Sequence, residues 1–169
     1  DGDGTMTWAA PGIISVQDFT SSGTWSRPSG CTKVLVHVVG GGGGARHGVS
    51  GGAKESDDIY GQGGDGGSAE EVIDVSSTAS VTVTIGAAGT SPEHTNAGGA
   101  GGTSSFGSFC SATGGAGGGD SGQASSGSGS GGQINRSGNT YGPSFGAGGL
   151  ALAGSAPGKA GYVYVVNYG

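Results

Sequence analysis

The sequence predicts an all-β protein, a glycine-rich β-sandwich whose strands are separated by long Gly-rich loops. β-branched residues gather in short runs that end at glycine or alternate with polar residues, which is typical of strands. No stretch has helical periodicity, and 1 Met with 6 Lys plus Arg leaves little helix-forming material. Glycine fills 44 of the 169 positions. The predicted fold therefore has no helices, and its connections are dominated by glycine.

Three segments are expected to be strands because of their side-chain patterns. Residues 34–39, Val-Leu-Val-His-Val-Val, are apolar on both faces apart from His37, as in a strand that is buried on both sides. Residues 81–85 alternate Val or Ile with Thr, which predicts a strand with one exposed face. Residues 161–168 place three tyrosines and Val166 on one face, and we expect them to form the closing strand.

Weaker patterns predict further strands at residues 16–20, 23–26, 70–75 and 103–109. Residues 26–30 are expected to form a turn, because proline presets φ at its first corner and glycine supplies freedom at the last.

Three Gly-rich insertions separate the strands, at about residues 40–68, 86–102 and 114–149. Each ordered glycine costs about 0.5 to 1 kcal/mol more in lost chain entropy than alanine. The glycines are therefore either disordered or held by contacts outside one small core. Two interpretations stay open. The GGxGG units are flexible spacers, or they pack as extended, polyproline-II-like segments whose bare backbones hydrogen-bond sideways.

Composition also narrows the classes of molecule that the protein could bind. With 12 acidic and 6 basic residues, the net charge is −6, which argues against nucleic acid and anionic membranes. No run approaches the roughly 18 apolar residues of a membrane span. Cys31 and Cys110 match no zinc or redox spacing; one disulfide and two lone core thiols are both compatible with the sequence.

The sequence matches known catalytic, phosphate-binding and metal-binding motifs only weakly. Residues 154–160 resemble a phosphate loop but are one residue short, and the GxGxxG matches open no helix. His37, His47 and His94 have no metal-ligand spacing, and His37 is expected to be a satisfied buried imidazole. Glu70 and its neighbour Glu71 point to opposite faces of a strand and cannot share a substrate. We therefore expect no catalytic residues, no metal and no cofactor.

The remaining functional signal is a recognition surface in the Gly-rich insertions. Aromatic side chains there lie close in sequence to amides and charged groups, a combination that suits sugar rings. The alternative is that the aromatics pin the loops to the sandwich or to a neighbouring subunit. The candidate receptor-binding residues are Asp57, Asp58, Tyr60, Asn135, Arg136, Asn139, Tyr141 and Phe145.

The order of several short motifs resembles the glycine-rich C-terminal domain of bacteriophage tail fibres, over about residues 16 to 168. The motifs are Phe-Thr-Ser-Ser-Gly-Thr-Trp at 19–25, then Pro28, Gly30, a valine-rich strand and the glycines at 40–44, Val-Thr-Val-Thr-Ile-Gly at 81–86, Gly-Gly-Thr-Ser-Ser-Phe-Gly at 101–107, and Gly-Tyr-Val-Tyr-Val at 161–165.

The resemblance implies a trimeric tip at the distal end of a virion's tail fibre, which contacts the bacterial surface and sets host range. Residues 1–15 would be the end of an upstream shaft or linker, and residues 16–169 the tip domain. The receptor would be a surface polysaccharide or an outer-membrane component. The low apolar content and the glycine load also favour a homotrimer, because neighbouring chains would supply contacts that one small core cannot.

Two other functions remain to be weighed. A flat Gly-rich face can order water, as ice binding requires, but the long irregular insertions break the necessary repeat. A capsular polysaccharide depolymerase would need paired acids in a groove, and such an enzyme is usually longer.

Overall fold

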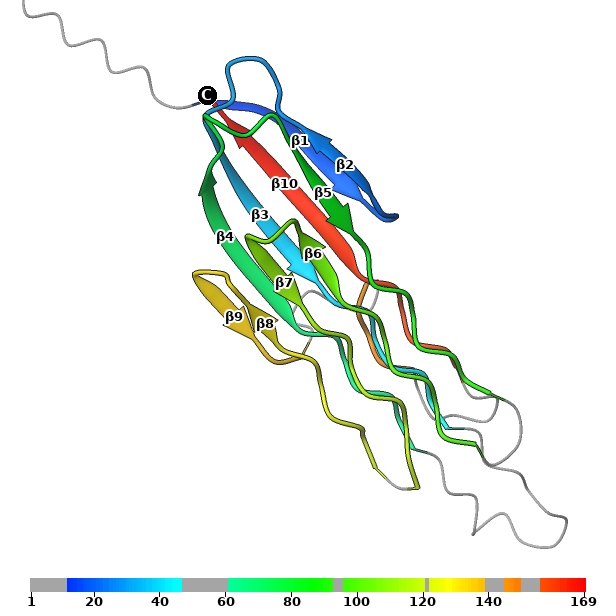
Figure 1. The fold of residues 1–169 in the computed structure, drawn as a ribbon. Helices are drawn as coiled ribbons and strands as arrows, with labels where there is room; N and C mark the ends of the chain where they lie inside the picture. The colour runs from blue at the N-terminus through cyan, green and yellow to red at the C-terminus, as the bar shows by residue number, and fades with distance from the viewer. Residues whose placement is uncertain (1–11, 47–60, 93–95, 121, 139–144, 150–155) are drawn as a thin grey trace, which may run out of the picture.

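The computed structural model describes residues 12–46, 61–92, 96–120, 122–138, 145–149 and 156–169. In these residues the protein is all-β, with two five-stranded antiparallel sheets packed face to face (Figure 1). The predicted fold class and the β-sandwich are confirmed. No helix in the described part is long and apolar enough to cross a membrane.

The first sheet has the order β1-β10-β3-β4-β9. Its strands are β1 (Ile13–Phe19), β10 (Tyr162–Tyr168), β3 (Lys33–Val39), β4 (Ser68–Asp74) and β9 (Ile134–Arg136). β1 begins before the boundary at residue 16 that the sequence suggests. The predicted closing strand, β10, pairs with both β1 and β3, so it lies inside the sheet and not at its edge.

The second sheet has the order β2-β5-β6-β7-β8. Its strands are β2 (Gly23–Ser26), β5 (Ser80–Thr84), β6 (Ser104–Phe106), β7 (Cys110–Ala112) and β8 (Gly129–Ser130). The single strand expected at residues 103–109 is wrong, because the chain reverses there. Gly107, with φ of 54°, lies in the turn of a hairpin between β6 and β7.

The core lies between the two sheets, where alternate residues of each strand face inward. Trp25 and Phe106 are its largest side chains, and their rings meet edge to face at 5.7 Å. Cys31 and Cys110 are both buried and free, and burial raises the pKa of the Cys110 thiol to about 11. Valines fill most of the rest, namely Val34, Val36, Val38, Val75, Val81, Val83, Val163 and Val165.

The Gly-rich insertions are not loops in their described parts. They continue the strands beyond the sandwich as extended segments that lie side by side, which we call the glycine bundle (Figure 1). Its segments are residues 40–46, 61–67, 86–90, 98–102, 113–119, 122–128, 146–149 and 156–161.

Segment 40–46 lies in the middle of the glycine bundle and bonds to its neighbours with a period of three. Gly40, Gly43 and Arg46 donate their amides to segment 61–67, at the carbonyls of Gly67, Gly64 and Gly61. The amides between them go to two other neighbours: Gly41 and Gly44 bond segment 98–102, whereas Gly42 and Ala45 bond segment 156–161. Three residues per turn without internal hydrogen bonds is the geometry of polyproline II. The polyproline-II-like interpretation is confirmed, and the described segments are not flexible spacers.

The bundle explains why the glycine runs take two forms. A Cβ on any glycine of the run 40–44 would come within 3.0 Å of a neighbouring backbone carbonyl, because this segment is surrounded. In the outer segments one residue in three faces away from the bundle. Ala100 and Ala116, the middle residues of two GGxGG units, occupy such positions and are exposed, whereas the middle residue Asp65 is partly buried and its carboxylate accepts from the amide of Gly148 at 2.7 Å. GGGGG therefore marks the centre and GGxGG the outer segments.

Candidate functional site

The molecule has two different ends. Near the chain ends, the amide of Gly169 donates to the carbonyl of Gly12 at 3.2 Å. At the far end of the bundle, Arg46 forms an ion pair with Asp120 and donates its amide to Gly61. Arg46, Gly61 and Asp120 thus lie together at the end of the molecule opposite Gly12 and Gly169 (Figure 1).

Among the predicted receptor-binding residues, Asp57, Asp58, Tyr60, Asn139 and Tyr141 lie outside the described residues.

The other three belong to or adjoin the first sheet. Asn135 in β9 closes a local turn, accepting from the amide of Gly132 at 3.1 Å and donating to its carbonyl at 2.6 Å. Arg136, also in β9, pairs with Glu70. Phe145 stacks on Tyr162 with ring centroids 4.4 Å apart. The structure thus brings Arg136 and Phe145 to the outer face of the first sheet, and Asn135 stabilises the β9 turn.

A groove of about 460 Å³ lies on this outer face, over β3, β4 and β10. The strand register builds it, because His37 of β3 lies opposite Glu70 on β4 and Tyr164 on β10. The groove is lined by Leu35, His37, Val39, Glu70, Phe145, Tyr162 and Tyr164.

One wall of the groove is aromatic. Phe145, Tyr162 and Tyr164 form a continuous stack, with 6.5 Å between the two tyrosine rings. The Tyr162 hydroxyl donates to Asp18 of β1 at 2.8 Å, and burial together with this bond raises the pKa of Tyr162 to about 12. Sequence alternation predicted the tyrosine face of β10. It could not predict Phe145 on that face, since the contact joins distant parts of the chain.

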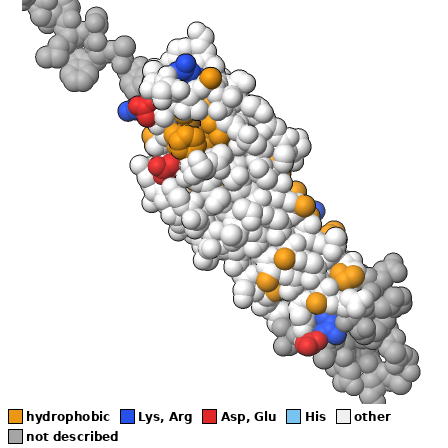
Figure 2. Space-filling view, in the orientation of Figure 1, with side chains coloured by type: hydrophobic (Ala, Val, Ile, Leu, Met, Phe, Trp, Pro, Cys, Tyr) orange, Lys and Arg blue, Asp and Glu red, His pale blue; other side chains and the backbone are white. Residues whose placement is uncertain are grey.

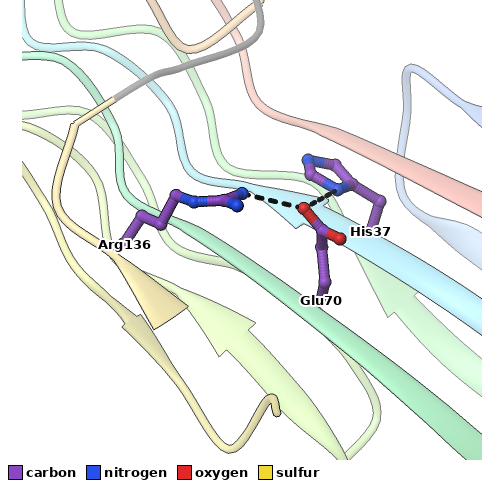
Figure 3. A network of polar contacts seen from close by, with 3 residues as sticks. All are labelled: His37, Glu70 and Arg136. Carbon is purple, nitrogen blue, oxygen red and sulfur yellow. Dashed lines mark hydrogen bonds and ion pairs between the residues drawn. The ribbon is translucent and has the colours of Figure 1, made fainter. Parts of the chain in front are cut away.

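The other wall is a polar network of His37, Glu70 and Arg136 (Figure 3). Glu70 Oε1 lies 2.9 Å from Arg136 Nη1 and 3.5 Å from His37 Nδ1. Burial lowers the pKa of His37 from its ordinary value of 6.5; the charge of Glu70 opposes this shift and that of Arg136 adds to it. At neutral pH the network therefore contains a neutral imidazole beside a carboxylate and a guanidinium whose charges cancel.

This network was only partly predictable from the sequence. His37 is half-buried beside a carboxylate, whereas alternation alone suggested a simple buried imidazole. Glu70 and Glu71 diverge as predicted, since Glu71 accepts from the amide of Gln133. Among the described residues, no group of three or more His, Cys, Asp or Glu side chains could hold a metal ion.

The shifted pKa of His37 predicts that lowering the pH below about 6.5 destabilises the protein. The unfolded chain takes up a proton near its ordinary pKa, whereas the folded protein resists protonation, so the free energy of unfolding falls. Urea unfolding at pH 7.5, 6.5 and 5.5 measures this. The variant His37→Gln should show a shallower loss, and identical pH profiles for both proteins would contradict the prediction.

The paired antiparallel sheets and the glycine bundle define a glycine-rich all-β domain. The sequence gives the same assignment, since the family model of the glycine-rich domain matches residues 17–168. The chain belongs to this family. A comparison with curated proteins finds no match.

Proposed function

We propose that this protein is the tip domain of a bacteriophage tail fibre and adsorbs to the host by binding a surface polysaccharide or an outer-membrane receptor. The bipolar architecture is the observation that carries the proposal. Gly12 and Gly169 lie together at the sandwich end, while Arg46, Gly61 and Asp120 lie together at the opposite end of the bundle. Connections held on a rigid scaffold are where binding residues concentrate. The sandwich end would join the fibre shaft, and the bundle end would face the cell.

The surface of the bundle agrees with binding at its end. Figure 2 shows the middle of the molecule as mostly backbone and uncharged polar side chains; most charged side chains in view lie near the two ends, and one basic side chain lies at the right edge between them. Such a flank offers few groups that distinguish one ligand from another. Arg46 and Asp120, by contrast, lie at the bundle end, and Asp120 is 88% exposed.

The proposed tip is a homotrimer, joined through the sandwich end. The glycine load alone no longer requires partner chains, because the bundle segments hold one another. The edge strand β1 still exposes apolar side chains, with Ile13 64% and Val16 46% exposed. Burial of Ile13 and Val16 at the contacts between three copies of the protein would stabilise the trimer and leave the bundle end free.

Light scattering tests the trimer. We expect three times the mass of one chain, and a lower mass for Ile13→Asp with an unchanged circular dichroism spectrum. A folded wild-type monomer at micromolar concentration would contradict the trimer.

Adsorption is tested with fluorescently labelled protein on a panel of bacterial strains. A stacked aromatic anchor is worth about 2 kcal/mol or more, and Tyr60 precedes Gly61 at the bundle end, so Tyr60→Ala should weaken binding to susceptible cells by roughly thirtyfold. The matched control is Ala100→Ser on the exposed flank of the bundle, which should bind as wild type.

Two results would change the assignment. If binding survives Tyr60→Ala, Tyr141→Ala and Phe145→Ala one by one, the receptor site lies elsewhere. If purified capsule is cleaved by the protein, the function is that of a depolymerase.

A further inference from the structure

We propose that the groove on the outer face of the first sheet is a second binding site, which takes a neutral sugar ring. This site goes beyond the proposed function, which places the receptor site at the far end of the bundle, although Arg136 and Phe145 at the groove are also candidate receptor-binding residues. It rests on three properties of the groove: an aromatic wall, a charge-balanced polar wall and a rigid floor.

The aromatic wall suits the apolar face of a pyranose. Tyr162 is held between Phe145 and Tyr164 and is tied to Asp18 by its hydroxyl, so the rings are fixed before a ligand arrives. The C–H groups of a sugar ring pack on such aromatic faces. Leu35 and Val39 add apolar surface to the lining.

The polar wall suits the hydroxyl groups of the same ring. Glu70 supplies carboxylate oxygens, and its side chain is 23% exposed, so it remains accessible to solvent. Arg136, whose side chain is 40% exposed, can donate from the same side. Hydroxyls both donate and accept, so they can bond a carboxylate and a guanidinium together.

The charge balance selects against ionic ligands. The Glu70 carboxylate and the Arg136 guanidinium neutralise each other, and His37 is neutral at neutral pH. An anionic ligand would lose hydration without gaining a free cation, and a cationic one would have to compete with Arg136 for Glu70. A neutral ligand neither loses the hydration of a charge nor competes with Arg136 for Glu70.

The dimensions and rigidity of the groove also fit a small ligand. Its volume of about 460 Å³ falls in the range of ligand pockets, about 300 to 1,000 Å³. β3, β4 and β10 each pair with two neighbouring strands, so none is an edge strand free to shift. A preformed site loses little conformational entropy on binding.

Isothermal titration calorimetry of the purified protein with methyl glycosides of glucose, galactose and mannose tests the proposal. We expect at least one to bind with a millimolar dissociation constant, and N-acetylneuraminic acid, which is anionic, to bind at least about tenfold more weakly. Glu70→Gln and Tyr164→Ala should each weaken binding of the neutral sugar by about tenfold or more. Glu70→Gln removes a charged hydrogen-bond acceptor, and Tyr164→Ala removes an aromatic face on which the sugar stacks. Tyr168→Ala is the matched control, since this tyrosine is on the same strand and face but outside the groove lining.

Several outcomes would overturn the site. These are no binding of any neutral glycoside, tighter binding of the anionic sugar, or equal binding by the wild type and both groove variants. A lower oligomeric mass for Tyr164→Ala would show that the groove is an interface between copies. Tyr60 precedes Gly61 at the bundle end, so cell adsorption through Tyr60 does not depend on any of these results and the two proposals can fail separately.

Discussion

Gly115→Ala is expected to destabilise the protein by at least about 3 kcal/mol, which lowers the melting temperature by about 6 to 12 °C. Gly115 lies in bundle segment 113–119, and a Cβ there would overlap the backbone carbonyl of Gly64 in the neighbouring segment. Backbone cannot rotate away as a flexible side chain can. Relief therefore requires the two segments to separate, which breaks their hydrogen bonds.

Gly119→Ala is the matched control, because it makes the same change in the same segment. A Cβ at Gly119 meets nothing within 4 Å, so the variant should melt within about 2 °C of the wild type. Gly64→Ala should behave like Gly115→Ala, since its Cβ would overlap the carbonyl of Ser125. Differential scanning calorimetry measures all three variants. If Gly115→Ala and Gly119→Ala melted together, the bundle contacts would not contribute to stability.

The strands and the bundle were predictable from the sequence to different degrees. Regular alternation at residues 81–85 and 161–168 located β5 and β10, because a side-chain period of two is a local property. β8 and β9 were missed, because they are two and three residues long and mostly polar. The glycine segments could be interpreted in two ways. A run of glycines has no side-chain pattern that would show whether other segments pack against it. Only the hydrogen-bond partners decide between a spacer and a polyproline-II helix.

The groove was less predictable than the fold. It depends on the register that places Glu70 opposite His37, and on Arg136 reaching Glu70 from the unpredicted strand β9. Both are long-range pairings that no local pattern encodes. Phe145 was predicted as a candidate anchor, and its stack on Tyr162 matches the alternative in which an aromatic pins its segment to the sandwich.

The bundle links the fold to the proposed function. Most of its hydrogen bonds join backbone groups, so an outward alanine in a GGxGG unit contributes little to holding the segments together, whereas the carboxylate of Asp65 accepts from the amide of Gly148 at 2.7 Å. Ala100 and Ala116 occupy such positions. Outward residues and connections can therefore vary while the glycines keep the scaffold rigid. A tip that must follow changes in a host receptor needs this separation between scaffold and contact surface.

Trp25→Ala is expected to cost about 3 to 5 kcal/mol of stability, as large-to-small changes of a buried aromatic do. Trp25 is fully buried on β2, where it packs against Phe106 of the same sheet. Its indole Nε1 donates to Asn167 Oδ1 of β10 at 2.9 Å, so the side chain also joins the two sheets. Removal of the ring would leave a cavity at the centre of the sandwich and a buried amide without this donor.

Trp25→Phe separates these two contributions, because it keeps an aromatic ring and removes the N–H. We expect a loss of about 1 to 3 kcal/mol for this variant, less than for alanine. Thr24→Ala, at an exposed position next to Trp25 on β2, should change the free energy of unfolding by less than about 1 kcal/mol. Guanidinium unfolding followed by circular dichroism measures all three. Equal losses for Trp25→Phe and Trp25→Ala would show that the hydrogen bond between the sheets, and not the packing of the ring, accounts for the stability that Trp25 provides.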